Sequence, residues 1–289
     1  MKNIYLITGI AGFIGSNICE RLLDLGEKVI GLDNFSGGFK ENLEFISSHP
    51  NKENFTFYEG DIRNIKDCEK ACENVDYVLH QAALGSVPRS MKEPLLYHEN
   101  NITGILNMLD AAKNNNVKRF VFASSSSVYG DTPTLPKIET MPPRPKSPYA
   151  VNKLTGEYYC KLYTQCYGLP TIALRYFNIF GKRQNPKSQY SAVIPKFITA
   201  YLNNESPTIF GDGEQTRDFT YVENVIKANL NACQAKESAF GKAMNIGCGY
   251  RISLNELAKD IKDIIGSTKN PIYEESRAGD VRDSLASIE

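Results

Sequence analysis

Three side chains near the middle of the sequence have the types and the spacing needed to move a proton. Tyr149 and Lys153 lie four residues apart in a helix-like stretch, so they share one face of the expected helix. A free tyrosine, with a pKa of about 10, is a poor base at neutral pH, but a nearby ammonium group favours the phenolate and lowers that pKa. Ser125 lies 24 residues before Tyr149 and can hydrogen-bond the same substrate oxygen. Together they predict a base that removes a hydroxyl proton as hydride leaves the same carbon.

The Tyr-x-x-x-Lys spacing alone is common, and the ordinary alternative is a helix face whose lysine extends into solvent. A glycine-rich loop upstream, running from Thr8 to Gly15 between a predicted strand and a predicted helix, favours the catalytic interpretation. Glycines let the backbone turn tightly, and the N–H groups at the start of the helix can bind a pyrophosphate. We therefore expect a dinucleotide site rather than a simple tight turn, formed by Gly9, Ala11, Gly12, Phe13, Ile14 and Gly15.

A carboxylate at the end of the second predicted strand indicates which dinucleotide binds. Asp33 lies 18 residues after Gly15, where it can accept hydrogen bonds from both ribose hydroxyls of adenosine and would repel a 2′-phosphate. The next residues, Asn34 and Phe35, offer no cation for such a phosphate. NAD is therefore the expected cofactor, and Asn34 is expected to contact it.

Two further pairs of residues follow predicted strands, where an open parallel sheet binds its ligand. Asp61 and Ile62 follow the third strand, and Ala82 and Ala83 follow the fourth. Asp61 is expected to accept a hydrogen bond from the adenine amino group, with a helix cap as the alternative role. All four residues are predicted to contact the cofactor.

The order of the predicted elements defines the frame that positions these residues. Helices at 13–25, 65–73, 94–114 and 149–167 alternate with strands at 3–8, 28–32, 55–58, 77–79, 119–123 and 171–176. This alternation predicts an α/β fold with a doubly wound parallel sheet, a Rossmann fold. The proline-rich stretch 132–148 is expected to be a surface loop.

The pattern loosens after about Phe177. Helix-like pieces at 192–202, 222–232 and 254–265 are separated by short strands and loops. We therefore predict two domains, with an NAD-binding Rossmann domain over residues 1–177. A smaller mixed α/β lobe over residues 178–289 would bind the substrate.

Composition excludes several classes of function. The 289 residues include 33 Lys or Arg and 33 Asp or Glu, so the formal net charge is zero and no general basic field serves nucleic acid or an anionic membrane. No apolar run approaches the roughly 18 residues of a membrane helix, and no signal-peptide pattern opens the sequence. Seven scattered cysteines without zinc-ligand spacing are typical of free thiols in a reducing cytosol. We expect a cytoplasmic protein with no bound metal.

Taken together, these motifs resemble the extended short-chain dehydrogenase/reductase superfamily, in its NAD-dependent nucleotide-sugar epimerase and dehydratase branch. The resemblance covers nearly the whole chain, and the stretch His80–Ser90 is similar to the UDP-N-acetylglucosamine 4-epimerase group. It implies that Ser125, Tyr149 and Lys153 are the catalytic residues. Dehydratases of this branch carry an Asp-Glu pair where this chain has Ser126 and Ser127, so a 4,6-dehydratase is not expected.

The resemblance also implies the remaining contacts. Asn100 and Phe177 should contact NAD, and the arginines Arg217 and Arg277 suit a diphosphate because each can donate two hydrogen bonds in a fork. The expected contacts of a UDP-sugar are Gly85, Ser86, Ser125, Ser126, Tyr149, Asn178, Gln184, Ala192, Val193, Arg217, Arg277, Asp280 and Ser284.

Ser284 bears on the choice of sugar. In epimerases of this branch the corresponding residue borders the C2 substituent, where a tyrosine leaves room only for a hydroxyl and a small residue admits an N-acetyl group. The resemblance thus favours interconversion of UDP-N-acetylglucosamine and UDP-N-acetylgalactosamine. UDP-glucose with UDP-galactose and the UDP-uronate pair are the alternatives within the class. A net oxidoreductase that exchanges NADH with solvent and a non-catalytic dinucleotide sensor are the alternatives outside it.

Two expectations concern assembly and length. The family implies a homodimer formed through the helices at 94–114 and 149–167. Family members usually continue with a further helix and a closing segment, so the second lobe is expected to be naturally short or truncated at its C-terminus.

Overall fold

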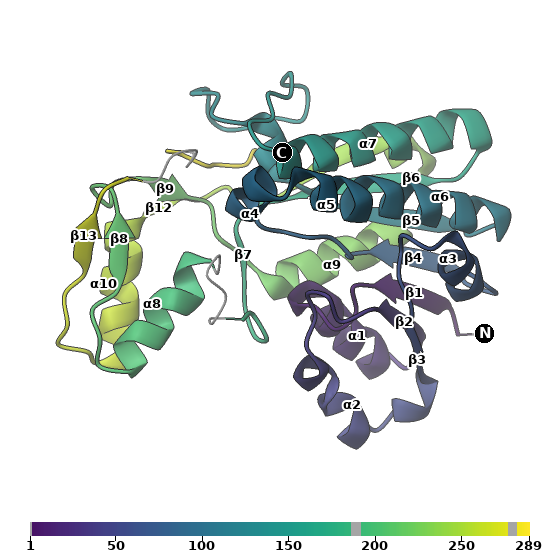
Figure 1. The fold of residues 1–289 in the computed structure, drawn as a ribbon, viewed down its shortest axis with the longest axis horizontal. Helices are drawn as coiled ribbons and strands as arrows, with labels where there is room; N and C mark the ends of the chain where they lie inside the picture. The colour runs from purple at the N-terminus through teal and green to yellow at the C-terminus, as the bar shows by residue number, and fades with distance from the viewer. Residues whose placement is uncertain (1, 186–191, 277–281) are drawn as a thin grey trace.

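A seven-stranded parallel sheet forms the centre of the protein in the computed structural model, which describes residues 2–185, 192–276 and 282–289 (Figure 1). The strand order is β11-β6-β5-β4-β1-β2-β3, and every neighbouring pair is parallel. The predicted doubly wound sheet is confirmed. Its strands are β1 (Ile4–Thr8), β2 (Lys28–Asp33), β3 (Phe55–Glu59), β4 (Tyr77–His80), β5 (Arg119–Ser125), β6 (Thr171–Tyr176) and β11 (Lys242–Ile246).

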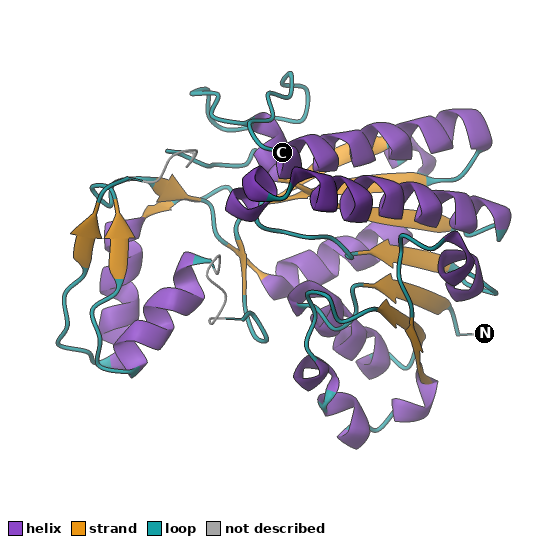
Figure 2. Cartoon of the chain, viewed as in Figure 1, coloured by secondary structure: helices purple, strands orange, loops and turns teal. Residues whose placement is uncertain are grey.

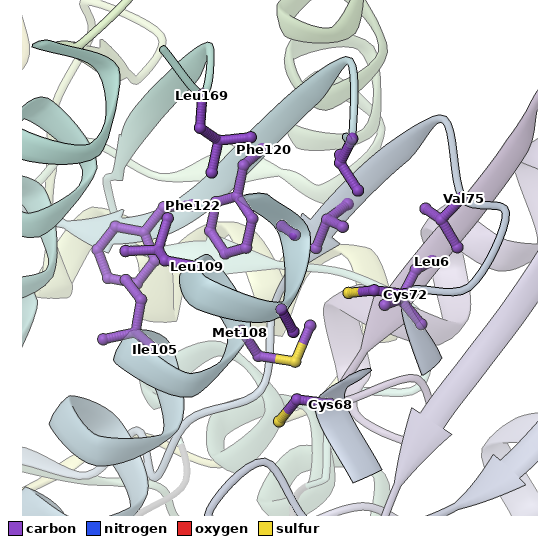
Figure 3. Packing of buried hydrophobic residues seen from close by; sticks show 14 of the residues in the cluster. Leu6, Cys68, Cys72, Val75, Ile105, Met108, Leu109, Phe120, Phe122 and Leu169 are labelled. Carbon is purple, nitrogen blue, oxygen red and sulfur yellow. The ribbon is translucent and has the colours of Figure 1, made fainter. Parts of the chain in front are cut away.

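Helices cover both faces of this sheet (Figure 2). On one face, α3 (Ile65–Ala71), α6 (Gly104–Asn114) and α7 (Pro148–Tyr167) pack over a core that includes Met108, Phe120 and Phe122 (Figure 3). On the other face, α1 (Phe13–Asp24) and α9 (Val222–Cys233) pack over a second core. Since both faces are buried, the central strands carry mainly apolar runs, such as Tyr77–Leu79 and Phe120–Ala123, as is typical of parallel strands between two helical layers.

The helix predicted over 94–114 is helical throughout but is not α-helical throughout. It divides into α5 (Pro94–His98), a π-helical turn over Glu99–Thr103, and α6. A π-turn accommodates one extra residue within a helix and commonly marks a functional site. Here the turn contains Asn100 and Asn101, which are both buried.

The predicted boundary at Phe177 does not separate the sheet from the second lobe. Both α9 and β11 lie beyond residue 177, yet α9 packs against α1 and β11 pairs with β6 at the edge of the sheet. The chain therefore leaves the sheet after β6, contributes α8 (Val193–Leu202) to the smaller lobe, and returns to the sheet with α9 and β11. The sequence pattern did not reveal that α9 and β11 belong to the central sheet, because the elements after residue 177 are irregularly spaced.

The remaining elements form a smaller lobe beside the sheet (Figure 1). Its core packs Phe197 and Tyr201 of α8 (Val193–Leu202) against Leu257 and Ile261 of α10 (Leu254–Ile265). A capping box between Ser253 and Glu256 begins α10. The short strands around this core form two-stranded pairs, namely β7 (Ile179–Phe180) with β10 (Thr220–Tyr221), β9 (Thr216–Arg217) with β12 (Ile252–Ser253), and β8 (Thr208–Phe210) with β13 (Ile272–Glu274).

The two lobes are joined by more than the connecting chain. The proline-rich stretch is a loop, as predicted, but Lys137 within it is buried and exchanges backbone hydrogen bonds with Leu285 and Ser287. Two short helices, α2 (Phe45–Ser48) and α4 (Val87–Lys92), complete the described helices of more than one turn. Among the described residues, no helix combines the length and apolar character that membrane crossing requires, and no cluster of metal-ligating side chains occurs.

Candidate active site

The glycine loop lies between β1 and α1 and is shaped for close approach of a ligand to the backbone. Gly9 has a φ of +69°, and a Cβ there would lie 2.8 Å from backbone atoms of Ala82. A Cβ on Gly15 would lie 2.3 Å from the Gly9 carbonyl oxygen. Glycine is therefore required at both positions, and the first turn of α1 presents its N–H groups at this point.

Asp33 ends β2 beside this loop and is already held by the backbone. Its carboxylate accepts hydrogen bonds from the backbone N–H groups of Ala11, at 2.9 Å, and Phe35, at 2.8 Å. Burial raises the pKa of Asp33, against the opposing effect of these bonds. The carboxylate is thus fixed in the place where the sequence predicted recognition of a ribose.

A loop after Asp33 closes over the glycine loop. The backbone N–H of Phe39 and the side chain of Asn42 both donate to the carbonyl oxygen of Ala11, and Gly38 lies so close to Ala11 that a Cβ would overlap it. Gly9 and Gly12 of the glycine loop and Ser36–Gly38 of this second loop border a cavity of about 120 Å³. Of the predicted cofactor contacts, its lining includes Gly9, Gly12, Asp33, Asn34, Ile62, Ala82, Ala83 and Asn100.

The lining also includes residues that sequence reasoning missed, among them Leu84, Gln81 and the Ser36–Gly38 segment. The Gly37-Gly38 pair after the second strand was the available signal. Ala11, Phe13, Ile14 and Gly15 lie in the loop and first turn but are not among the lining residues, and Phe177 is buried against Tyr129. A glycine cradle, a fixed carboxylate and exposed helix N–H groups fit a dinucleotide pyrophosphate and its ribose.

Asp61 has partners of its own at the edge of this cavity. Arg63 binds its carboxylate at 2.6 Å and Asn34 donates to it at 2.9 Å. Hydrogen bonding from Arg63 holds the pKa of Asp61 down at about 2. The carbonyl oxygen of Asp61 accepts a hydrogen bond from the backbone N–H of Asn64, and the side chain of Asn64 caps α3. The residue that caps this helix is therefore Asn64 and not Asp61. Contact with adenine remains a prediction for Asp61.

The structure brings Ser125, Tyr149 and Lys153 together at the carboxyl end of β5. Ser147 caps α7 and Pro148 occupies its first turn, so Tyr149 projects from the start of the helix and Lys153 lies one turn later. The Ser125 side chain lies beside the Tyr149 phenol and acts to lower its pKa. The Lys153 ammonium is 2.7 Å from the carbonyl oxygen of Ala123 and 5.8 Å from the centre of the Tyr149 ring.

The pKa values in the protein alone differ from the sequence expectation. Burial raises the pKa of Tyr149, only partly offset by the Ser125 side chain, and burial lowers the pKa of Lys153 to about 8. The net pKa of Tyr149 is therefore raised, whereas a lowering of this pKa by Lys153 stays a prediction. The physical reason is that desolvation acts on both groups, while the ammonium hydrogen-bonds a carbonyl group.

A buried ion pair between Arg175 and Glu157 lies next to the Ser125–Tyr149–Lys153 set. Arg175 on β6 binds both carboxylate oxygens of Glu157, at 2.9 and 2.7 Å, and Glu157 lies one turn after Lys153 on α7. Glu157 also accepts a hydrogen bond of 2.5 Å from Ser124, the neighbour of Ser125. Each partner of the buried pair is thus neutralised and hydrogen-bonded, which fixes β5 against α7.

A second cavity, of about 240 Å³, opens into the smaller lobe. Of the predicted substrate contacts it is lined by Asn178, Ala192, Val193 and Arg217. Aromatic walls that the sequence did not indicate come from Phe180, Phe197, Phe210 and Phe219. Its aromatic lining beside Arg217 suits a flat base next to an anionic group, and Asn178 in this lining follows β6.

The other predicted substrate contacts are placed as follows. Ser86 caps α4 and donates its backbone N–H to the hydroxyl of Tyr97, while Gly85 is exposed beside it. Gln184 donates to the carbonyl oxygen of Ile179, and the Ser284 hydroxyl accepts from Asn178 at 3.1 Å. Ser126 follows Ser125 in a short turn. Arg277 and Asp280 lie outside the described residues.

Comparisons with known proteins give the family. Residues 5–247 match the model of the NAD dependent epimerase/dehydratase family. A putative UDP-glucose 4-epimerase of Methanocaldococcus jannaschii is 42% identical over 279 residues, which cover 96% of this chain and 87% of that protein. The UDP-N-acetylglucosamine 4-epimerase from Methanobrevibacter ruminantium M1, in complex with UDP-N-acetylmuramic acid, is 45% identical with a TM-score of 0.94, over 100% of this chain and 91% of that one.

A third similar protein was solved with its ligands. The UDP-glucuronic acid 4-epimerase from Bacillus cereus, in complex with UDP-glucuronic acid and NAD, is 34% identical with a TM-score of 0.90, over 99% of this chain and 90% of that one.

Sheet topology, glycine loop and the Ser125–Tyr149–Lys153 set define an extended short-chain dehydrogenase/reductase with NAD as cofactor. Within that class, the chain belongs to the NAD-dependent epimerase/dehydratase family. It is an enzyme, an isomerase of the NAD-dependent nucleotide-sugar 4-epimerase type.

Proposed function

We propose that the protein interconverts UDP-N-acetylglucosamine and UDP-N-acetylgalactosamine through a 4-keto intermediate. The observation that carries this proposal is the meeting of Ser125 and Tyr149 at the edge of the sheet that also bears both cavities. Residues 1–177 would supply most of the NAD site and residues 178–289 most of the nucleotide-sugar site.

The proposed chemistry begins at the sugar C4 hydroxyl. Tyr149 takes the proton of this hydroxyl while Ser125 donates a hydrogen bond to the same oxygen. NAD, when bound, supplies the site that accepts hydride from C4 and returns it. Lys153 holds the nicotinamide ribose and, as an ammonium, favours the phenolate of Tyr149. The 4-keto sugar turns over within the pocket, Tyr149 returns the proton after hydride reaches the other face, and no net oxidation occurs.

The absence of carboxylates next to Ser125 supports epimerisation over loss of water. Ser126 and Ser127 occupy the positions of the dehydratase Asp-Glu pair, and the backbone N–H of Ser127 donates to the Ser125 hydroxyl at 3.2 Å. Hydroxyl groups at their ordinary pKa cannot act as the acid or base for dehydration.

The nucleotide would occupy the cavity of the smaller lobe. Arg217 would bind the diphosphate, and Asn178 lies at the mouth of the same cavity. Apolar and aromatic lining is suited to the uracil ring. Gly85, Ser86, Ser126, Gln184, Arg277 and Asp280 would complete the contacts with the UDP-sugar.

Ser284 favours the N-acetylated sugars. It is half-buried, and its hydroxyl accepts a hydrogen bond from Asn178, which lines the nucleotide cavity. A serine leaves the volume that a tyrosine would fill, and filled pockets reject added groups by overlap. Similarity to the Methanobrevibacter enzyme supports the same choice, whereas the Methanocaldococcus and Bacillus proteins keep UDP-glucose and UDP-glucuronate as alternatives.

We also propose that the protein is a cytoplasmic homodimer. Val151, Tyr158 and Leu162 form an exposed apolar stripe along α7, and Met91 and Leu95 lie exposed on the neighbouring α4 and α5. Sedimentation of the purified protein tests the dimer, and Tyr158→Glu with Leu162→Glu should yield monomers.

The decisive experiment incubates the holoenzyme with each UDP-hexose and separates the C4 epimers. We expect UDP-N-acetylglucosamine and UDP-N-acetylgalactosamine to reach one equilibrium mixture from either side, without added NAD and without release of NADH. Epimerisation of plain UDP-hexoses alone would contradict the proposed sugar. Absence of any epimer would contradict the proposed reaction.

A further inference from the structure

One buried carboxylate near the substrate cavity is used by no step of the proposed reaction. Asp218 directly follows Arg217 and is completely buried. Its carboxylate accepts three backbone hydrogen bonds, from Cys248 at 2.9 Å, Gly249 at 3.1 Å and Ala286 at 3.0 Å. An ionised acceptor strengthens such bonds, and a buried carboxylate with fewer partners would be costly.

These three bonds join segments that are distant in the sequence. Cys248 and Gly249 follow the edge strand β11, whereas Ala286 belongs to the segment 282–287 near the end of the chain. Segment 282–287 is not part of a regular sheet. It is held by backbone hydrogen bonds with Thr216 and Lys137, by side-chain bonds of Asp283 and Arg282, and by burial of Ala286.

The backbone of Asp218 and its neighbours in sequence are connected to the predicted substrate contacts. Asn178 donates its side-chain amide both to the backbone carbonyl oxygen of Asp218, at 2.9 Å, and to the Ser284 hydroxyl, at 3.1 Å. Ser284 lies two residues before the Ala286 N–H that Asp218 binds, and Arg217 lies one residue before Asp218. Asp218 is therefore connected to three residues assigned to the nucleotide sugar: to Asn178 by a hydrogen bond, to Ser284 through the segment bound at Ala286, and to Arg217 as its neighbour in the chain.

Gly247 shows how little room this junction has. A Cβ at Gly247 would lie 2.5 Å from the Ala286 Cβ and 3.0 Å from an Asp218 carboxylate oxygen. Segment 282–287 is thus pressed against the turn after β11 at the point where Asp218 binds both. A small change there must displace the segment or the turn.

We propose that Asp218 is a positioning residue for the nucleotide sugar, an inference that rests on the proposed function. Asp218 holds segment 282–287 so that Ser284 and Asn178 keep the places from which they shape the substrate site. It contacts neither the NAD cavity nor the Ser125–Tyr149 pair. Its loss should therefore weaken substrate binding while the chemical step and NAD retention stay close to those of the unchanged enzyme.

The test compares Asp218→Asn with the unchanged holoenzyme. An asparagine nearly preserves the shape of the side chain. Both carboxylate oxygens of Asp218 accept hydrogen bonds from backbone N–H groups, so the amide N–H₂ of an asparagine would face a donor and lose at least one of these bonds. We expect KM for the UDP-sugar and Kd for UDP to rise about tenfold or more, the scale of one lost charge-assisted hydrogen bond. We expect kcat to change less than about threefold and the NAD content to be unchanged. Amide hydrogen exchange of Ala286 and Gly249 should accelerate.

Two further variants separate positioning from general stability. Asp76→Asn is the control, because Asp76 also accepts a backbone hydrogen bond, from Ile4 at 2.8 Å, but at the amino ends of the central strands β1 and β4, where it also pairs with Lys118. It should lower the melting temperature without raising KM. Gly247→Ala displaces the same junction without altering the carboxylate, so it should reproduce the rise in KM even if Asp218→Asn fails to fold.

The outcomes divide clearly. Equal losses in kcat and in UDP affinity, or UDP affinity unchanged in both Asp218→Asn and Gly247→Ala, would overturn the proposal for Asp218. Tight UDP binding by the unchanged protein without epimerisation of any UDP-sugar would overturn only the proposed function. In that case the UDP affinities of the variants would still decide the role of Asp218.

Discussion

The two cavities of this enzyme are built in different ways. The NAD cavity is formed mainly by backbone, with a glycine loop, strand ends and the loop that bonds Ala11, all within the first hundred residues. The substrate cavity is lined by side chains from short elements, and its borders depend on contacts between residues far apart in the chain. Under the proposed mechanism, a cofactor that is retained through every cycle suits a site made of backbone, whereas a sugar that rotates within its pocket suits a site made of side chains.

Tyr149→Phe should give the largest effect, a loss of turnover, because it removes the proposed proton acceptor of the reaction. We expect turnover to fall at least ~10²-fold, the usual scale for a positioned acid–base group, while NAD and UDP still bind. Initial rates with UDP-N-acetylglucosamine and the NAD content of the purified protein measure this. Tyr167→Phe, at the exposed end of the same helix, is the control. Near-normal turnover of Tyr149→Phe would remove Tyr149 from the mechanism.

Ser284→Tyr should alter the substrate cavity alone. The added ring fills the space proposed for the N-acetyl group, so kcat/KM for the acetylated sugars should fall by roughly tenfold or more relative to that for UDP-glucose or UDP-galactose. Ser284→Ala, which keeps the space open and loses only the bond from Asn178, should retain the original preference. An unchanged ratio in Ser284→Tyr would show that Ser284 does not border the C2 substituent.

Asp33→Ala should alter the NAD cavity alone. It removes the ribose acceptor together with the bonds to Ala11 and Phe35, so NAD should bind roughly tenfold more weakly and its advantage over NADP should narrow. Titration of the stripped protein with both cofactors measures the gap. Glu59→Ala is a matched control, because Glu59 is exposed and lies opposite Asp33 in the register of β2 and β3. Equal affinity for the two cofactors in the unchanged protein would contradict the assignment of Asp33.

Lys153→Met should give the smallest of these effects, a modest gain in the free energy of unfolding. Its effect on turnover should have the opposite sign, because the variant loses a residue of the proposed mechanism. The folded pKa of about 8 lies below the ordinary value, so the buried ammonium destabilises the fold below pH 8, and the free energy of unfolding rises with pH between about 8 and 10.5. Removing the charge should raise stability at pH 7 by ~1–2 kcal/mol, since each pKa unit corresponds to about 1.4 kcal/mol and the bond to Ala123 is lost.

Denaturant titrations of Lys153→Met and of the unchanged protein at pH 7 and pH 10 check this. The difference between the two proteins should shrink as the pH rises. Lys161→Met, exposed on the same helix, should show no such convergence. A less stable Lys153→Met at pH 7 would mean that the ammonium stabilises the folded protein.

More of the predicted cofactor contacts than of the predicted substrate contacts line a common cavity in the structure. Gly9, Asp33 and Ala82 were identifiable because short motifs at strand ends place them, whatever the rest of the chain does. Phe180, Phe210 and Asp218 carried no such signal, because their roles arise from contacts across long separations in the sequence. The raised pKa of Tyr149 was also beyond sequence reasoning, since desolvation depends on the burial of the whole site.

The pairing of β11 with β6 has a consequence for the order of folding. The pairs β1–β2 and β5–β6 close loops of a few tens of residues, but β11 joins β6 only after the chain has passed through α8, β8 and α9. Contacts between distant segments form late because a longer loop must first close. We therefore expect the pairs β1–β2, β4–β5 and β5–β6 to form first, and the longer closures, β1 with β4 and β6 with β11, to follow. Slow refolding phases should then coincide with the recovery of both NAD binding and UDP binding, because the cavity assigned to NAD requires β1 beside β4.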